Sequence, residues 1–152
     1  RRGRKMDEEL RASVLLVDDE QDFLQVLKSR LQARGLEVTI ASSGEQGVKE
    51  VEVGHQFDLI ILDLAMPGMD GLETLRQIKS RQPEAEIMML SGRGTIRNSI
   101  EAMKLGAVDF LEKPLELNKL LSKIGQAKKN RMLMIESKSI AEVEKIIQSK
   151  GW

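Results

Sequence analysis

Polar side chains that could do chemistry follow the ends of four predicted strands. Asp18 and Asp19 come directly after "SVLLV", and Asp63 comes directly after "LIIL". Ser91 follows "IMML", and Lys113 follows "FLE". Runs of consecutive apolar residues are typical of strands in a parallel sheet, where helices cover both faces. A charged side chain at the end of such a buried strand therefore indicates a ligand or a charged partner at the edge of the sheet.

Together these five groups suit phosphoryl transfer. Clustered carboxylates such as Asp18, Asp19 and Asp63 repel one another unless a cation intervenes. Mg²⁺, or Mn²⁺, suits a site of carboxylates, water and phosphate oxygens. The Lys113 ammonium could neutralise one phosphoryl oxygen, and the Ser91 hydroxyl could donate to another. Asp63 is then the candidate nucleophile, because carboxylates can form acyl phosphates.

The elements that must position these groups alternate along the chain. Strands are predicted over residues 13–17, 36–41, 57–63, 85–91 and 107–112. Helices are predicted over residues 21–34, 43–53, 72–81 and 95–105, with a last helix after Pro114. Strict alternation predicts an α/β fold with a parallel sheet and right-handed helical crossovers. Ligands of such sheets bind at the carboxyl ends of the strands, where the polar groups above are expected.

Local signals support these boundaries. Ser43, followed three residues later by Gln46, resembles a capping box at a helix start. Gly35 and Gly54 stand where helices end in a left-handed residue. In the helix over 95–105, Ile96, Ile100 and Met103 are predicted to share one face.

Four motifs, found in order and at helix-length spacings, carry a family resemblance. They are "VLLVDDE", "ILDLAMPGMDG", "LSG" and "FLEKP". Over residues 13–126 the chain resembles a bacterial response-regulator receiver domain of the chemotaxis-regulator type. The resemblance implies a doubly wound, flavodoxin-like (βα)5 fold with a five-stranded parallel sheet in strand order 2-1-3-4-5.

The resemblance also assigns roles to matching residues. Asp63 corresponds to the phospho-accepting aspartate. Asp19 would ligate Mg²⁺ directly, Asp18 through water, and Ala65 with its backbone carbonyl. Taken alone, Asp18 and Asp19 could also be the N-cap and first-turn acid of the following helix, but the metal role is favoured.

Further positions correspond to the switching parts of a receiver. Ser91 resembles the switch hydroxyl, Lys113 the phosphate-contacting lysine and Phe110 the aromatic switch residue, although an aromatic residue in a strand is more often core. The Lys113–Pro114 bond resembles one that is cis in receivers. The output surface would be the face formed by residues 95–105, 107–112 and the helix after Pro114.

The resemblance implies a partner that supplies phosphate. His55 is the only histidine and is expected on the surface, so a histidine kinase or histidine phosphotransfer protein would donate to Asp63. The chain would not be an enzyme in the ordinary sense, although it would catalyse its own phosphotransfer and slow dephosphorylation. Slow dephosphorylation is expected because Ala65 and Arg93, two residues past Asp63 and Ser91, cannot readily orient an attacking water.

Composition limits the other function classes. Lys+Arg and Asp+Glu both number 24, cysteine is absent, and no apolar run approaches the length of a bilayer span. We therefore expect a cytoplasmic chain that binds neither membrane nor nucleic acid directly. Two other functional classes are alternatives. One is a Mg²⁺-dependent aspartyl-phosphate phosphatase, but such enzymes generally carry a second acid at the position of Ala65. The other is a structural or dimerising module.

The two ends of the chain are predicted to lie outside the receiver. Residues 1–12 read as a solvated basic tail, and residues 127–152 as a helical extension or linker. "KKNR" at 128–131 predicts a break, and "SIAE" at 139–142 resembles a capping box that opens a short amphipathic helix. The alternatives are an extended last helix, or a helix that dimerises or docks. The stretch "SGRGTIRNSIEAMKLGAVDFLEKPLELNKL" (residues 91–120) also resembles receivers of enhancer-binding transcription activators and of some hybrid kinases.

Overall fold

Strands and helices alternate along the chain in the computed structural model, which describes residues 11–66, 68–92 and 96–150. The strands are β1 (Ser13–Val17), β2 (Glu37–Ala41), β3 (Leu59–Asp63), β4 (Ile87–Ser91) and β5 (Asp109–Glu112). The helices are α2 (Gln21–Gln32), α3 (Gly44–Glu52), α4 (Gly71–Arg81), α5 (Ile96–Lys104) and α6 (Leu117–Ser149). Apart from the far end of α6, these bounds lie within a few residues of the predicted ones.

The five strands form one parallel sheet in the order β2-β1-β3-β4-β5. This confirms the predicted α/β fold and its strand order. The order reverses between β1 and β3, so the helices that follow these two strands cover opposite faces of the sheet. The crevice at their carboxyl ends is the place where such folds bind ligands.

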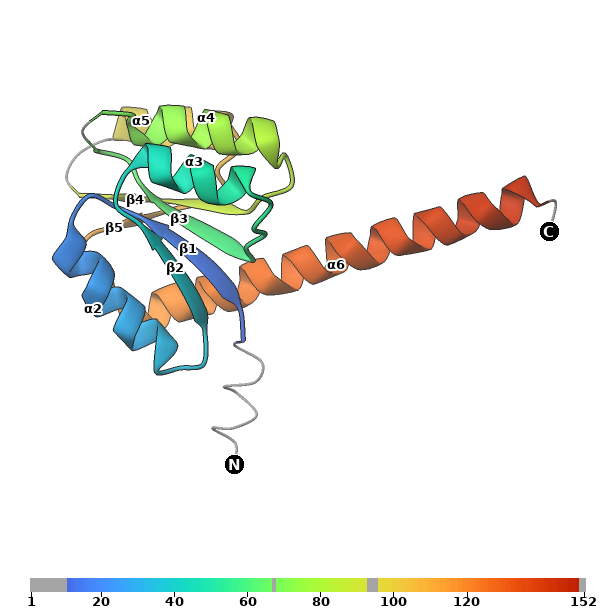
Figure 1. Cartoon of the computed structure of the whole chain (residues 1–152), viewed down its shortest axis with the longest axis horizontal. Coiled ribbons are helices and arrows are strands. Elements are labelled where there is room, and N and C mark those ends of the chain that lie inside the picture. Colours follow the sequence, from blue (N-terminus) through green and yellow to red (C-terminus); the bar gives the residue numbers. More distant parts are fainter. Residues whose placement is uncertain (1–10, 67, 93–95, 151–152) are drawn as a thin grey trace.

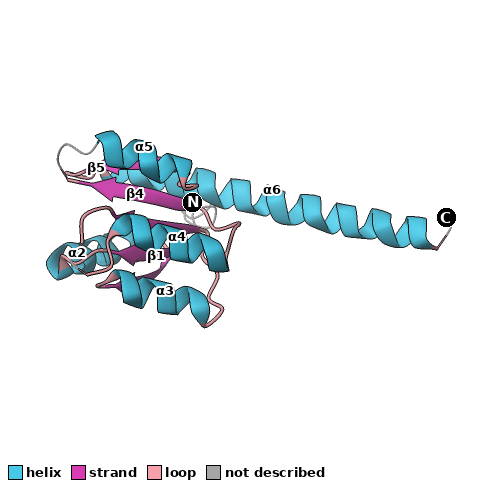
Figure 2. Ribbon diagram, turned by 90° about the horizontal axis from the view of Figure 1, so that it is seen from above, coloured by secondary structure: helices cyan, strands magenta, loops and turns pink. Residues whose placement is uncertain are grey.

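Two layers of helices cover the sheet (Figures 1 and 2). Helices α3, α4 and α5 pack on one face, and α2 and the first part of α6 pack on the other. Side chains of β1 alternate between the layers: Leu15 and Val17 point to the first, Val14 and Leu16 to the second. Burying one such side chain contributes about 1.5–3 kcal/mol. Because both faces are covered, β3 and β4 are apolar at every position before their last residues, Asp63 and Ser91.

The local signals are largely confirmed. Ser43 is the N-cap of α3, and its hydroxyl accepts a hydrogen bond from the Gln46 amide. The Gln46 side chain reaches one residue further back than a capping box requires and accepts from the Ser42 amide. Gly35 and Gly54 have φ of 86° and 90°, as expected for residues that end helices.

The apolar stripe predicted on α5 does not face the core. Ile100 and Met103 are 53% and 47% exposed, whereas Ala102 is fully buried against the sheet. The side chain of Ile96 lies outside the described part. The segment is a helix, as its spacing predicts, but Ile100 and Met103 lie on its outer side and the smaller Ala102 packs inward.

The break predicted at residues 128–131 is wrong, because α6 is one continuous helix of 33 residues. No proline or glycine lies between Gly125 and the last residue of α6, Ser149, and Ser139 lies inside the helix rather than at its start. Leu120 and Ile124 are fully buried against the sheet, while the part beyond residue 131 is exposed. The last helix is extended, as one alternative predicted (Figure 1). The other alternative, that this helix dimerises or docks, stays a prediction.

Two contacts hold the middle of α6 beside the body of the domain. Arg131 donates hydrogen bonds to the Phe57 carbonyl and the Gln56 side chain, and Lys138 forms an ion pair with Glu84. These contacts fix the direction in which the helix leaves the sheet. Among the described helices, α6 included, none is both long and apolar enough to cross a membrane.

Candidate functional site

The carboxylates singled out in the sequence meet at the carboxyl edge of the sheet. Asp63 is the last residue of β3, and Asp18 follows β1, where its amide donates to the Ala41 carbonyl. Asp18 and Asp63 are only 2% and 4% exposed, whereas Asp19 is exposed. One oxygen from each of the three lies within 4.8 Å of the others. The structure therefore brings together the three acids predicted to share a site.

Lys113 reaches into the same cluster from the end of β5. Its Nζ donates to Asp18 Oδ2 at 2.9 Å and to Glu20 Oε1 at 3.2 Å, and it lies 4.0 Å from Asp63 Oδ2. The ammonium also sits 4.6 Å from the centroid of the Phe23 ring, close enough for a cation–π interaction. One cation thus neutralises part of the charge of two buried carboxylates and is bonded to Asp18 rather than to Asp63.

Asp63 has an unusual protonation equilibrium. Burial raises its pKa to about 7 and the neighbouring Asp18 raises it as well, against the lowering effects of Lys113 and of the Ala65 amide that donates to Oδ1 at 3.2 Å. For Lys113, burial opposes the charge, but the hydrogen bond and charge of Asp18 outweigh it and raise the pKa. Without a further cation, Asp63 is therefore charged only in part near neutral pH.

Ser91 and Phe110 lie where the sequence placed them. Ser91 is the buried last residue of β4; its hydroxyl donates to the Gly92 carbonyl, and its own carbonyl accepts from the Lys113 amide at 2.7 Å. The Lys113–Pro114 peptide bond is cis, as predicted. Phe110, in β5, is half-buried against the core layer under α3, α4 and α5. Its packing is that of a core residue at the edge of the sheet.

The donor set fits a hard divalent cation. It consists of carboxylate oxygens, of which two belong to buried side chains whose ionised forms need a positive charge nearby. Lys113 supplies only part of that charge, since the pKa of Asp63 stays raised in its presence. Oxygen ligands of this kind select Mg²⁺, Mn²⁺ or Ca²⁺ over softer metals.

The loop after Asp63 closes on itself and starts the next helix. The Gly71 amide donates to the Leu64 carbonyl at 3.1 Å, and Asp70 caps α4 by accepting from the Glu73 amide. The loop leaves Ala65 exposed, beside the Asp63 carboxylate to which it is hydrogen-bonded. Asp70 therefore acts as a helix cap, and the site stays open to solvent over Ala65.

Comparison with known proteins identifies the class to which this fold and site belong. The model of the response regulator receiver domain matches residues 14–125, which is most of the chain. The chain belongs to the response regulator receiver family.

Relatives of the chain include transcriptional regulators of bacteria. The chain is 33% identical over 129 residues to the transcriptional regulatory protein FixJ of Bradyrhizobium diazoefficiens, with 85% of the chain and 62% of that protein covered. It is 34% identical over 114 residues to the transcriptional regulatory protein ZraR of Klebsiella oxytoca, covering 75% of the chain. It spans only 26% of the length of ZraR.

Solved structures give the same result. A receiver domain protein from Clostridium thermocellum superposes with a TM-score of 0.77 at 36% identity, covering 81% of the chain and 98% of that protein. The chemotaxis protein CheY4 of Vibrio cholerae superposes with a TM-score of 0.71 at 30% identity, covering 77% and 98%. The likeness to both extends over the whole receiver fold.

Several contacts of the site were not foreseen from the sequence. Glu20, which directly precedes α2, has a carboxylate that is an ion-pair partner of Lys113. The ring of Phe23, on α2, contacts the ammonium of Lys113. Glu45, on α3, accepts a hydrogen bond from the Met69 amide in the loop that follows Asp63. These contacts join distant segments, so no local pattern announces them.

Two further expectations concern residues away from the acids. His55 is on the surface, as predicted, where its ring pairs with Glu50. Arg93, which was invoked together with Ala65 for slow dephosphorylation, lies outside the described residues.

Proposed function

We propose that this chain is the phospho-accepting part of a two-component phosphorelay and that Asp63 is the acceptor. The observation that carries the proposal is the burial of Asp63 at the end of β3 beside Asp18, with the Lys113 ammonium 4.0 Å away. A buried nucleophile, a paired cation and a set of metal-binding oxygens are the parts that phosphoryl transfer needs.

A bound Mg²⁺ would be held by oxygens of Asp18, Asp19 and Asp63 and by the Ala65 carbonyl, and it would supply positive charge to the phosphoryl oxygens. The residues of the chain prepare the rest of the site. Lys113, held 2.9 Å from Asp18, lies within a short side-chain movement of Asp63 and can follow the incoming charge. The Ala65 amide holds Asp63 Oδ1, which orients the other oxygen for attack.

In the transfer, an Asp63 oxygen attacks the phosphorus of a phosphohistidine on a histidine kinase or histidine phosphotransfer protein. The new P–O bond forms as the P–N bond breaks, and the electron pair stays on the ring nitrogen, which takes up a proton. Lys113 and the Ser91 hydroxyl stabilise the phosphoryl oxygens. The chain thereby catalyses its own phosphorylation and a slow hydrolysis of the acyl phosphate, and it acts on no other substrate.

Phosphorylation would be read out on the face formed by α5, β5 and the start of α6. Ser91 moves toward the phosphoryl group and Phe110 follows it, which biases a two-state equilibrium at that face. Ile100, Met103 and Val108 are 46–53% exposed there, so the face offers apolar surface to a partner or a second copy. The output is a linked domain or partner protein; the cytoplasm as its compartment and the absence of direct nucleic-acid binding stay predictions.

Labelling with acetyl phosphate and Mg²⁺ tests the acceptor. Intact-mass spectrometry should show one added phosphoryl group on the wild-type chain and none on Asp63→Asn. Asp22→Asn, which changes an exposed acid on α2, is the control and should be labelled normally. Undiminished labelling of Asp63→Asn would overturn the assignment of Asp63.

A further inference from the structure

A carboxylate on a neighbouring helix holds the loop that follows Asp63. Glu45 lies in the first turn of α3, and its Oε1 accepts a hydrogen bond from the Met69 amide at 3.2 Å. Backbone hydrogen bonds at Glu45 itself and from Met69 lower the pKa of Glu45, so this carboxylate is ionised at neutral pH. A charged acceptor makes a stronger hydrogen bond to an amide than a neutral one does.

The end of α3 that carries Glu45 is fixed against this loop. A Cβ on Gly44 would lie 2.2 Å from the Thr74 hydroxyl of α4 and 2.8 Å from the Met69 carbonyl, so only glycine fits this approach. Ser43 caps the helix one residue earlier. The position of the Glu45 carboxylate therefore follows from the packing of α3 against the loop.

The same loop carries the backbone groups that the site uses. It runs from Leu64 to Gly71 and is closed by the hydrogen bond between these two residues. At its start, the Ala65 amide donates to Asp63 Oδ1. Toward the end of the loop, the Met69 amide donates to the Glu45 carboxylate. The backbone of this loop is thus held at two described points, by Asp63 at Ala65 and by Glu45 at Met69.

We propose that Glu45 is a positioning residue for phosphorylation: by holding the Met69 amide it keeps the Ala65 backbone, and through it the Asp63 carboxylate, in the orientation for attack. This inference rests on the proposed function of Asp63. Glu45 does not touch the acceptor or the phosphoryl donor; it acts through the loop. Loss of the hydrogen bond should slow phosphoryl transfer, since a small misplacement of a nucleophile lowers the rate steeply.

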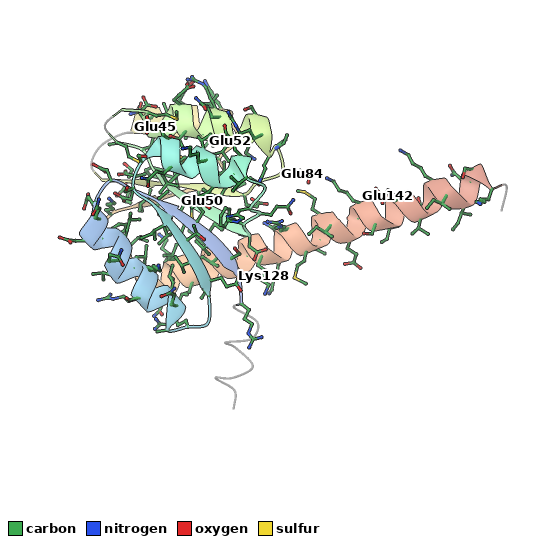
Figure 3. All side chains as sticks on the ribbon, viewed as in Figure 1. Glu45, Glu50, Glu52, Glu84, Lys128 and Glu142 are labelled. Atoms are coloured by element: carbon green, nitrogen blue, oxygen red, sulfur yellow. The ribbon has the colours of Figure 1, made fainter. Side chains whose placement is uncertain are left out.

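Two substitutions separate this role from charge and from general stability. Glu45→Ala removes the acceptor, and Glu45→Gln keeps a side-chain oxygen of the same reach without the charge. Glu52→Ala is the matched control, because Glu52 lies at the other end of α3 from Glu45 (Figure 3). Its carboxylate forms an ion pair with Arg81 of α4 at 2.7 Å. The substitution therefore removes a different contact of α3, one that does not involve the loop.

The experiment measures the initial rate of acetyl-phosphate labelling of each full-length chain with saturating Mg²⁺, together with its urea unfolding midpoint. Glu45→Ala should label about three- to tenfold more slowly, in line with the cost of a modest misplacement. Glu45→Gln and Glu52→Ala should label within about twofold of the wild type, as expected when the nucleophile keeps its place.

Labelling rates that differ from these expectations contradict different parts of the proposal. A Glu45→Ala chain that labels like the wild type refutes the positioning role while leaving Asp63 as acceptor. A Glu45→Gln chain as slow as Glu45→Ala shows that charge, not the hydrogen bond, matters, and a slow Glu52→Ala chain shows that only helix packing matters. A wild-type chain that takes no label refutes the proposed function itself, irrespective of Glu45.

Discussion

At the scale of single residues, Asp63 combines two opposing demands. A nucleophile must be ionised, yet burial and Asp18 favour the protonated form and raise its pKa to about 7. Lys113 offsets this only in part, because its hydrogen bonds go to Asp18 and Glu20. Lys113 alone does not balance the negative charge of the carboxylates. Binding of a metal cation would therefore increase the ionised, nucleophilic fraction of Asp63.

Lys113 is expected to matter for both chemistry and stability. Lys113→Met keeps the apolar stem but leaves the buried carboxylates of Asp18 and Asp63 without their ammonium. We expect acetyl-phosphate labelling to fall at least about tenfold, since a charge that stabilises the transferred group is lost. The free energy of unfolding at pH 8 should fall by about 1–3 kcal/mol, as measured in urea without divalent ions. Labelling at the wild-type rate would remove Lys113 from the mechanism.

Ala65, two positions past the acceptor Asp63, determines the expected lifetime of the phosphorylated state. Ala65 is exposed two positions past Asp63 and has no group that could orient water for hydrolysis. We predict that the phosphorylated chain, freed of donor by desalting, loses its label over minutes to hours. Ala65→Gln should shorten that half-life by about three- to tenfold, because an amide can position the attacking water. A half-life of seconds in the wild type would contradict this prediction.

At the scale of elements, the sequence predicted what local patterns encode. Leu59–Leu62 are apolar because helices cover both faces of β3, and Asp63 is the first residue to emerge from it. The five strands and the meeting of their polar ends follow from such runs. The contact from Glu45 to Met69 spans 24 residues of sequence and has no periodic signature. The break expected at residues 128–131 failed because lysines, asparagine and arginine are compatible with a helix interior.

The exposed part of α6 carries an apolar stripe that we propose pairs with a second copy of the chain. Ile140, Val143 and Ile147 follow helical spacing and are 37–54% exposed. They lie on a different side of the helix from Arg131 and Lys138, which contact the body of the domain. A single helix with this much exposed apolar surface is marginal in water, so pairing would stabilise it.

A single charge in the stripe tests the pairing. Ile140→Glu should raise the dimer dissociation constant at least about tenfold in sedimentation equilibrium, because it places a charge in an apolar interface. Lys145→Glu changes a charge on another side of α6 and should leave the constant within about threefold, as is usual for charges at the rim. A wild-type chain that stays monomeric at hundred-micromolar concentration would rule out the dimer.

At the scale of the whole molecule, one helix links the site to the exposed extension. α6 begins four residues after Lys113, and Leu120 and Ile124 pack on the same face of the sheet as Leu111 of β5. The same helix then continues through Arg131, its contact with the body, into the extension. A shift of β5 on phosphorylation would therefore be passed to a rigid rod rather than to a flexible linker.

Stability of the whole chain should report the protonation of Asp63. Its pKa is about 7 in the folded protein against 3.8 ordinarily, so between these values the folded state binds more protons than the unfolded state. The contribution of Asp63 to the free energy of unfolding therefore falls as pH rises from about 4 to about 7 and is constant above. Asp63→Asn removes this cost and, without divalent ions, should be more stable than the wild type at pH 8 by about 1–4 kcal/mol.

At pH 8, Mg²⁺ should stabilise the wild type more than Asp63→Asn. Binding requires Asp63 to be ionised, so the wild type should gain several degrees of melting temperature from saturating Mg²⁺ at pH 8, and little at pH 5.5, where the ion competes with a proton. Asp63→Asn lacks one of the three carboxylates and should gain less at either pH. Differential scanning calorimetry with Mg²⁺ or with a chelator measures all four cases. An equal Mg²⁺ effect at both pH values would show that Asp63 is not a ligand, and its raised pKa would then have no connection with the metal.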